Sequence, residues 1–324
     1  MSYNLRSRSV LRAHSSARKT NSKITDLRAH YLKLYPNAHE GFKIFLGEGK
    51  KWRCLNQLYR VGVVVKMDSN PELCRRGFHY CEQAANCLRH YGPDPPAKFA
   101  RVIALGKVVH STNRAKSVTN ELVPVEELSR EQFLEHCTGW TVDESGNETY
   151  HHKGVNCSID DMPAVVSWNG EETWKNKHEQ KHRDKGPAVV MTTGTHLKLF
   201  WMIEDCEHRV GAPSAIRYNV GEKTLEFYFG RRRADTSGRH NPFGPAVMIF
   251  YRKTKTKHEK YALHGTSFSK VEWELRRKDY SDPDAEAIYS KWDFDKIDSD
   301  FMSASIFDVD SLVRSWLLKW KDEP

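Results

Sequence analysis

The sequence predicts a mainly β fold of the α+β class: a small N-terminal α+β domain, an antiparallel array of β-hairpins and a helical C-terminal cap. The first observation behind this prediction is a short sequence motif that occurs four times and consists of a proline, a small residue and an apolar strand. Its prolines, which lie 24, 26 and 32 residues apart, are Pro163, Pro187, Pro213 and Pro245. Repeats of that length indicate units too small to bury a core alone. The second observation is an apolar stripe at helical spacing near the C-terminus.

Composition excludes several classes of protein. Of the 324 residues, 39% are hydrophobic and 11% aromatic, which is enough for a packed core. The longest apolar runs, residues 61–65 and 199–203, are far shorter than the roughly 18 residues of a membrane-spanning helix. No signal peptide is visible. The seven scattered cysteines, an odd number, favour a reducing compartment. We therefore expect neither a membrane segment nor secretion.

Charge is distributed unevenly along the chain. The net charge is +9, yet residues 281–324 hold five Lys and Arg against eleven Asp and Glu. Residues 1–21 are polar and basic, and we expect them to form a flexible arm. The candidate contacts to nucleic-acid phosphates or to a partner protein lie in this arm and in one later run: Arg6, Arg8, Arg12, Arg18, Lys19, Arg231, Arg232 and Arg233.

The arm and a short helix form a first segment, residues 1–37. Ile24, Leu27, Tyr31 and Leu34 recur at helical spacing and predict that this helix packs on the domain that follows. Residues 38–137 have the pattern of a compact α+β domain. The elements that we predict in it are strands at 58–65, 99–109 and 118–125, a turn at 75–80 leading into another strand, and a helix at 82–91.

Residues 138–267 contain the array of about four hairpins. Turn signals between paired apolar strands occur at residues 169–170, 193–194, 219–221 and 253–257. A histidine and an arginine are adjacent in sequence before three of the four proline motifs: His182 and Arg183, His208 and Arg209, and Arg239 and His240. We expect these histidines to make hydrogen bonds that fix the turn between units. The alternative is that they are metal ligands or respond to mild acid.

Residues 268–324 form the acidic, helical C-terminal cap. Capping boxes at Ser129 and Ser269 predict one helix before the array and one after it, and we expect these helices to close its two ends. Near the C-terminus, an apolar stripe contains Val309, Leu312, Val313, Trp316, Leu317 and Trp320. A stripe of this size must be covered. We expect Trp316 and Trp320 to be buried on the end of the array, the alternative being a partner protein.

Two parts of the chain resemble known modules. The segments KHRDKGPAVV at residues 181–190 and HNPFGPAV at 240–247 resemble the "HRxDGPA" hairpin repeats, called MORN-like, of phages and large DNA viruses. The segment CRRGFHYC at 74–81, with residues 104–106 and 116–120, resembles an uncharacterised N-terminal domain from the same sources. The third repeat departs from the pattern at residues 210–212. The resemblance covers residues 42–265 and implies a viral protein of the host cytoplasm or the virion.

One group of side chains has the chemistry of a metal site: Cys74, His79, Cys81 and Cys87. Four nitrogen and sulfur ligands suit tetrahedral zinc. Their spacing, however, is wrong for a zinc knuckle, and small cysteines in a core explain them as well. We therefore expect no metal, no cofactor and no small-molecule substrate.

Function is predicted to be non-catalytic. The chain lacks a Walker loop, a GxSxG elbow, an HExxH helix and a GxGxxG turn. We expect a viral interaction or virion-associated structural protein that binds other viral or host proteins through the array. One alternative is an ADP-ribosyltransferase-like enzyme in the N-terminal domain, with Glu121 or Glu126 as its catalytic carboxylate. The other is nucleic-acid binding through the basic arm.

Overall fold

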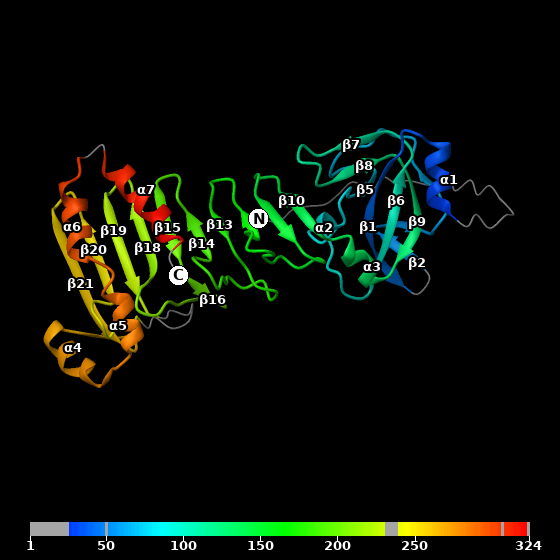
Figure 1. Ribbon diagram of the computed structural model, residues 1–324. Coiled ribbons are helices and arrows are strands. Elements are labelled where there is room, and N and C mark those ends of the chain that lie inside the picture. The colour runs from blue at the N-terminus through cyan, green and yellow to red at the C-terminus, as the bar shows by residue number, and fades with distance from the viewer. Residues whose placement is uncertain (1–25, 49–50, 231–238, 306–307, 323–324) are drawn as a thin grey trace, which may run out of the picture. The chain divides into compact units, whose positions relative to one another are not determined.

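In the computed structural model, the described residues, 26–48, 51–230, 239–305 and 308–322, have a mainly β fold of the α+β class, as predicted (Figure 1). The chain forms two compact units. The first unit runs to Glu144 and includes His151–Gly154, and the second consists of Ser145–Tyr150 and the chain from Val155. Each unit has hydrophobic clusters of its own. The eight arginines and lysines that sequence analysis assigns to partner contacts lie outside the described residues.

The first unit contains two antiparallel sheets, with strand orders β3-β2-β1-β6-β9-β4 and β5-β8-β7. Its elements are α1 (Leu27–Leu34), β1 (His39–Glu48), β2 (Lys51–Cys54), β3 (Gln57–Tyr59), β4 (Val65–Lys66), β5 (Phe78–Tyr80), α2 (Ala84–Cys87), β6 (Ala97–Ala104), β7 (Val108–His110), β8 (Ser117–Thr119), β9 (Glu121–Leu128), α3 (Arg130–Glu135) and β10 (Gly139–Val142). Backbone hydrogen bonds between Phe42 and Cys81 link the two sheets.

The predicted strands of this unit are shorter than expected, because two of them change sheet. The expected strand 99–109 divides into β6 and β7 around Gly106, and the expected strand 118–125 divides into β8 and β9 at Asn120. The Asn120 side chain accepts a hydrogen bond from the Lys107 amide at 2.8 Å, which fixes both breaks together. The expected strand 58–65 is likewise interrupted, by a turn at Gly62. The helix predicted at 82–91 is only the single turn α2.

Helices α1 and α3 cover the larger sheet. Leu27 and Tyr31 of α1 pack against Ile103 and Val123, as the sequence predicts. Helix α3 has the predicted capping box at Ser129. Its Phe133 is fully buried in the first unit, because Phe42, Phe99 and Leu128 surround it there.

The second unit is a long antiparallel sheet in which hairpin follows hairpin (Figure 1). Its strands are β11 (Glu148–His151), β12 (Val165–Val166), β13 (Glu172–Thr173), β14 (Val189–Met191), β15 (His196–Phe200), β18 (Pro213–Asn219), β19 (Thr224–Phe229), β20 (Val247–Tyr251), β21 (Thr256–Leu263) and β22 (Thr266–Phe268). A separate small hairpin joins β16 (Met202–Ile203) to β17 (Cys206–Glu207). The four predicted turns are those of the hairpins β12–β13, β14–β15, β18–β19 and β20–β21.

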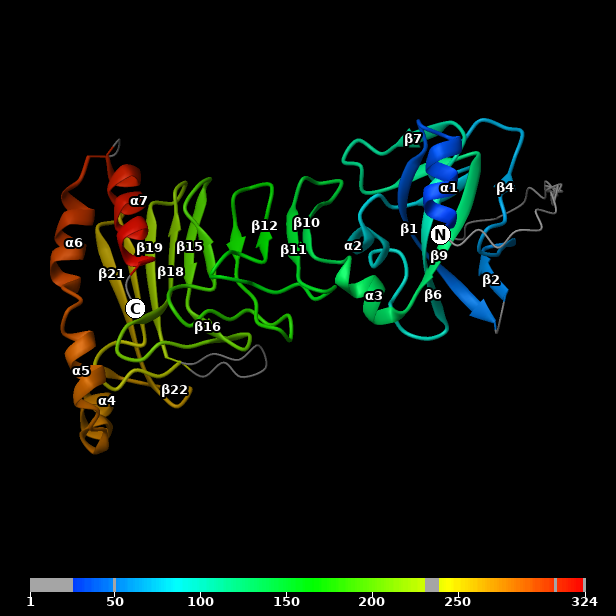
Figure 2. The same ribbon diagram turned by 45° about the vertical axis from the view of Figure 1, so that its right-hand side comes forward.

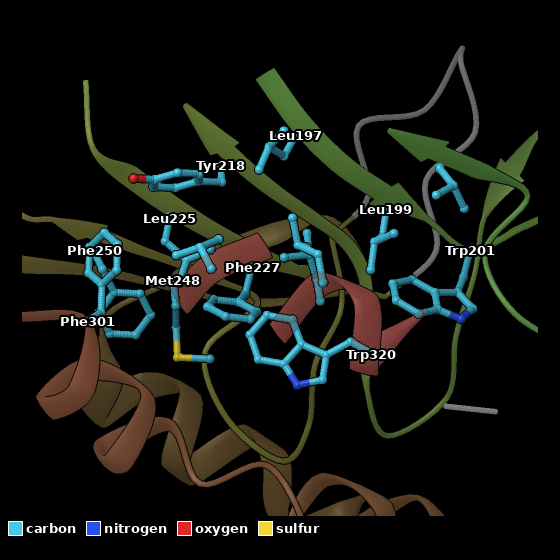
Figure 3. Packing of buried hydrophobic residues seen from close by; sticks show 14 of the residues in the cluster. Leu197, Leu199, Trp201, Tyr218, Leu225, Phe227, Met248, Phe250, Phe301 and Trp320 are labelled. Carbon is cyan, nitrogen blue, oxygen red and sulfur yellow. The ribbon is translucent and has the colours of Figure 1, made fainter. Parts of the chain in front are cut away.

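One face of this sheet carries the main core. Period-two alternation places Leu197, Leu199, Tyr218, Leu225 and Phe227 on the same face, where all are at most 1% exposed (Figure 3). The Ala and Ser residues that follow the repeated prolines are also buried, and the strands begin at or within two residues of each proline. Proline there costs no hydrogen bond inside a strand.

Among the described residues after the sheet there are four α-helices, with a 3₁₀ turn at Arg277–Asp279: α4 (Lys270–Arg276), α5 (Pro283–Tyr289), α6 (Phe294–Ser303) and α7 (Val309–Trp320). Helix α4 begins at the predicted cap Ser269 and packs its Trp273 on Tyr261 and Leu263 at the last hairpin. Helix α7 is placed differently from the prediction. It lies across the face of the sheet, not at its end (Figure 2). The reason is that Leu225, Phe227 and Phe229 make this face too apolar to stay uncovered.

Candidate functional site: a basic cleft in the first unit

A cleft of about 950 Å3 lies in the first unit. Its walls come from β1, from the turn between β2 and β3, from residues 66–69, from residues 74–81 and from the end of α2. The volume is in the range of sites that hold a small molecule. No small-molecule substrate is expected from the sequence, in which the residues of the walls lie up to 74 positions apart, from Phe42 to Lys116.

Residues 74–81 form one wall, and Gly77 determines their path. Its φ is +123°, and a Cβ there would lie 2.5 Å from the Val118 Cγ2 atom and 2.9 Å from the Thr119 carbonyl oxygen. Any side chain at this position would therefore prevent β5 from pairing with β8. The turn before it brings Arg75 and Arg76 to the rim, because the amides and carbonyls of Glu72 and Arg76 bond each other.

Lys43 is a buried cation at the cleft. It lies in the middle of β1 and is only 5% exposed. Its ammonium donates to the His79 carbonyl oxygen at 2.6 Å and lies 5.5 Å from the centre of the Phe45 ring. Within the part of the chain that the structure describes, Lys43 forms no ion pair with a carboxylate. Burying an ammonium group without a carboxylate beside it costs free energy, because a buried charge is normally paired with an opposite charge.

The other charged groups of the cleft make it basic. Lys116 approaches the Cys74 sulfur with its ammonium at 3.2 Å, and Arg75 and Arg76 stand at the rim. Asp68 is the carboxylate that lines the cleft among the described residues. The lining also includes apolar surface from Leu55, Met67 and Tyr91. Positive charge beside apolar and aromatic surface favours an anionic ligand that carries a ring.

His79 is neutral near pH 7. Burial, together with the neighbouring Lys43 and Lys116 ammonium groups, lowers the pKa of His79 to about 4. Its Nε2 atom accepts a hydrogen bond from the Cys74 amide at 3.0 Å, so this nitrogen carries no proton. His79 therefore shapes the 74–81 turn and is not placed to donate a proton from Nε2.

Two buried thiols lie beside the same cleft. Hydrogen bonding from Cys87 lowers the pKa of Cys81, against the effect of burial, while burial raises the pKa of Cys87. The Cys87 sulfur lies 3.4 Å from the Phe42 carbonyl oxygen as well, which is an alternative acceptor for its single proton. Cys74 is instead exposed at the rim. In the described structure, the four ligand atoms suggested by the sequence do not gather at one point, and the His79 nitrogen is already in use.

The carboxylates suggested for ADP-ribosyl transfer lie outside the cleft lining. Glu121 forms an ion pair with Lys66 at 3.0 Å, and Glu126 forms one with Arg101 at 3.2 Å. Both residues belong to β9, which pairs in the larger sheet with β6 and β4. Neither carboxylate faces Lys43 in the cleft.

In the second unit, two of the repeated arginines make contacts that hold the turns, beside the histidines for which this role is expected from the sequence. The Arg183 guanidinium lies 3.9 Å from the Trp174 ring centre and donates to the Pro187 carbonyl oxygen at 3.3 Å. Arg209 repeats this arrangement over Trp201, at 4.0 Å. An arginine side chain is long enough to reach the carbonyl oxygen four residues further along the chain. Its guanidinium group can stack on the tryptophan ring and donate this hydrogen bond at the same time.

The fourth copy uses a different side chain for the same bond. Asn241 is buried and donates to the Pro245 carbonyl oxygen at 2.9 Å. In the first copy, Asn156 bonds the carbonyl of Ala164, next to Pro163, at 3.0 Å. The histidines make other contacts. His182 lies 3.0 Å from the exposed Asp184 carboxylate, and His240 accepts from the His264 amide at 3.1 Å. His208 has a contact of its own as well.

The face of the sheet opposite the core carries a row of aromatic and arginine side chains. The Arg217 guanidinium lies 5.0 Å from the ring centres of both Phe200 and Tyr228, and Arg239 lies 4.5 Å from Tyr228. Tyr251, on the next strand, is 38% exposed. Period-two alternation predicts this second face once the core face is known.

Comparison with known proteins gives one match. No curated protein and no solved structure matches the chain. Among the described helices, none is both long and apolar enough to cross a lipid bilayer. Residues 41–136 match the model of a domain of unknown function (DUF7666), in agreement with the uncharacterised domain that the sequence predicts there. The residues that line the cleft, from Phe42 to Lys116, all lie within the stretch that is similar to this domain.

Proposed function

We propose that the protein is a non-catalytic binding protein in which the cleft of the first unit holds a small anionic ligand and the sheet of the second unit contacts other proteins. The observation that carries the first part is the buried ammonium of Lys43. A ligand anion would supply the counter-charge that the neighbouring residues do not.

The cleft also favours a class of anion. Lys43 and Lys116 provide donors inside, and Arg75 and Arg76 provide a second pair of cations at the rim. Tyr91 and Met67 offer surface on which a planar ring can lie. This combination fits a phosphate-bearing ligand with a ring, of the nucleotide class. We also propose that the ligand is bound without chemical turnover. His79 is neutral and its Nε2 atom already accepts a hydrogen bond. Glu121 and Glu126 form ion pairs with Lys66 and Arg101 and do not line the cleft.

Calorimetric titration of the full chain with ADP, NAD and inorganic phosphate tests the ligand. We expect saturable binding of at least one nucleotide that weakens as salt is raised. Lys43→Met should weaken it by about 10-fold or more, the equivalent of about 1.4 kcal/mol. Lys98→Met is the matched control, since Lys98 forms an exposed ion pair with Glu127 in the same unit. Equal affinity in the two variants would remove Lys43 from the site. Release of nicotinamide from NAD would overturn the non-catalytic part.

The second part of the proposal, contact with other proteins, is favoured by the open face of the sheet. Its row of Phe200, Arg217 and Tyr228 combines aromatic surface with fixed cations, which are enriched at protein interfaces. The viral and virion-associated setting implied by the repeats belongs to this part. We expect the protein in purified virus particles. Tyr251→Ser, on the open face, should reduce its incorporation, while Leu318→Ser, on the solvent side of α7, should not. Equal incorporation would reject the open face as the contact surface.

A further inference from the structure

Three side chains that can bind a metal lie together at an edge of the first unit, outside the residues that line the cleft. They are His39, Glu82 and His110, and their ligand atoms all lie within 4.8 Å of one another. His39 is the first residue of β1, His110 the last of β7, and Glu82 follows β5 by two residues. Because 43 and 28 residues separate them, sequence spacing gives no sign of the group.

Strand pairing holds two of the three in place through Ser117. This residue lies opposite both Tyr80 and His110 in the small sheet. Its hydroxyl donates to the Glu82 carboxylate at 3.2 Å and lies 2.9 Å from Nδ1 of His110. The same carboxylate oxygen is 2.8 Å from that nitrogen. Glu82 and His110 are therefore already as close as two ligands of one metal ion, with a hydroxyl in position to orient the carboxylate.

His39 completes the group from the other sheet. Its ring centre lies 5.3 Å from that of His110, with the planes at 65°. His39 is exposed, while Glu82 and His110 are half-buried, so water can reach the group. Two imidazoles and one carboxylate on one side of an ion, with solvent on the other, are ligands that zinc and other divalent transition metals accept with positions left open.

We propose that His39, Glu82 and His110 bind one divalent transition-metal ion of the zinc class, with the remaining coordination positions open to water or to an anionic donor. A calcium or magnesium ion is disfavoured, because those ions prefer oxygen ligands. The proposal does not depend on a ligand in the cleft, and it replaces the sequence-based expectation of a metal-free protein with a site built from residues that the fold brings together.

The test uses the full chain without an affinity tag, freed of metal with a chelator. Calorimetry with ZnCl2 measures stoichiometry and affinity, and the visible absorption of added Co2+ reports the ligand set. We expect one ion per chain. His39→Ala, Glu82→Gln and His110→Ala should each weaken Zn2+ binding by more than about 10-fold, since loss of an outer-shell partner alone typically costs about 10- to 100-fold. His196→Ala, which removes an exposed histidine from β15 of the second unit, should leave it unchanged.

His39→Ala decides the outcome if a more buried variant fails to fold, since His39 is exposed and its removal leaves the hydrogen bonds of Glu82 and His110 in place. Circular dichroism in chelator checks folding of each variant. Failure of the wild-type chain to bind one Zn2+ would overturn the proposal, and so would unchanged affinity in a folded His39→Ala. A loss in His196→Ala equal to that in His39→Ala would show nonspecific binding to surface histidines and would also overturn it.

Discussion

Replacing Trp320 tests whether helix α7 belongs to the core of the second unit. Trp320 is 6% exposed, and its ring centre lies 5.7 Å from that of Phe227 and 5.4 Å from that of Trp292. Truncation of a large buried aromatic side chain to alanine costs about 3–5 kcal/mol. The area estimate agrees, because about 150–250 Å2 of buried surface at about 25 cal/mol per Å2 gives about 4–6 kcal/mol as an upper bound.

The expected loss in Trp320→Ala is therefore about 3–5 kcal/mol, or about 6–20 °C in melting temperature for a unit of this size. Urea unfolding followed by tryptophan fluorescence measures it. Of the nine tryptophans, only Trp52 and Trp140 lie outside the second unit, so the signal reports mainly that unit. Leu318→Ala is the matched control on the same helix, because Leu318 is 48% exposed. We expect it to cost about 0.5 kcal/mol or less.

Equal and small losses in Trp320→Ala and Leu318→Ala would refute the packing of α7 on the sheet. The helix would then be a docking segment for another protein, which is the alternative that the sequence leaves open. Size-exclusion chromatography separates the two cases further. Exposure of the sheet face in Trp320→Ala should promote association, since Leu225 and Phe227 lie beneath the helix.

Three further predictions concern other parts of the chain. Trp201→Ala should cost about 3–5 kcal/mol in urea unfolding, whereas Pro187→Ala should cost about 1 kcal/mol or less; equal losses would contradict the role of Trp201 in the core. Although burial acts to raise it, hydrogen bonds from Lys223 lower the pKa of Asp310. The contribution of the Asp310 carboxylate to the stability of the folded state is therefore fully present above its unfolded-state pKa of about 3.9. This contribution is lost as the pH falls through the lower pKa of the folded state. Asp310→Asn should be less stable by about 1–2 kcal/mol at pH 7, with the difference shrinking below pH 4; a pH-independent difference would exclude this charge effect. Deletion of residues 1–21 should leave the melting temperature unchanged and weaken salt-dependent retention on DNA; loss of cooperative unfolding would show that the arm is structural.

The sequence by itself determined the local features of this protein. The four hairpin turns, the capping boxes at Ser129 and Ser269, and the apolar stripe of α7 follow from patterns within roughly ten residues, and the fold class follows from these patterns together with the repeated prolines. Such patterns reflect steric preferences and side-chain periodicity, which act over short stretches of chain. The alternation of Leu197 and Leu199 likewise indicates that one face of their strand is buried.

Only the tertiary structure decided where these elements pack and which polar groups meet. At Gly106 and at Asn120 the chain passes from one sheet to the other, which shortened two expected strands. These two breaks depend on each other, because Asn120 packs closely against Gly106 and accepts a hydrogen bond from the Lys107 amide. The same packing buries Lys43 beside a cleft whose walls are far apart in sequence. It also brings His39, Glu82 and His110 together. Burial and proximity arise from contacts between distant segments, so the chemistry of both sites depends on distances that no local pattern of residues encodes.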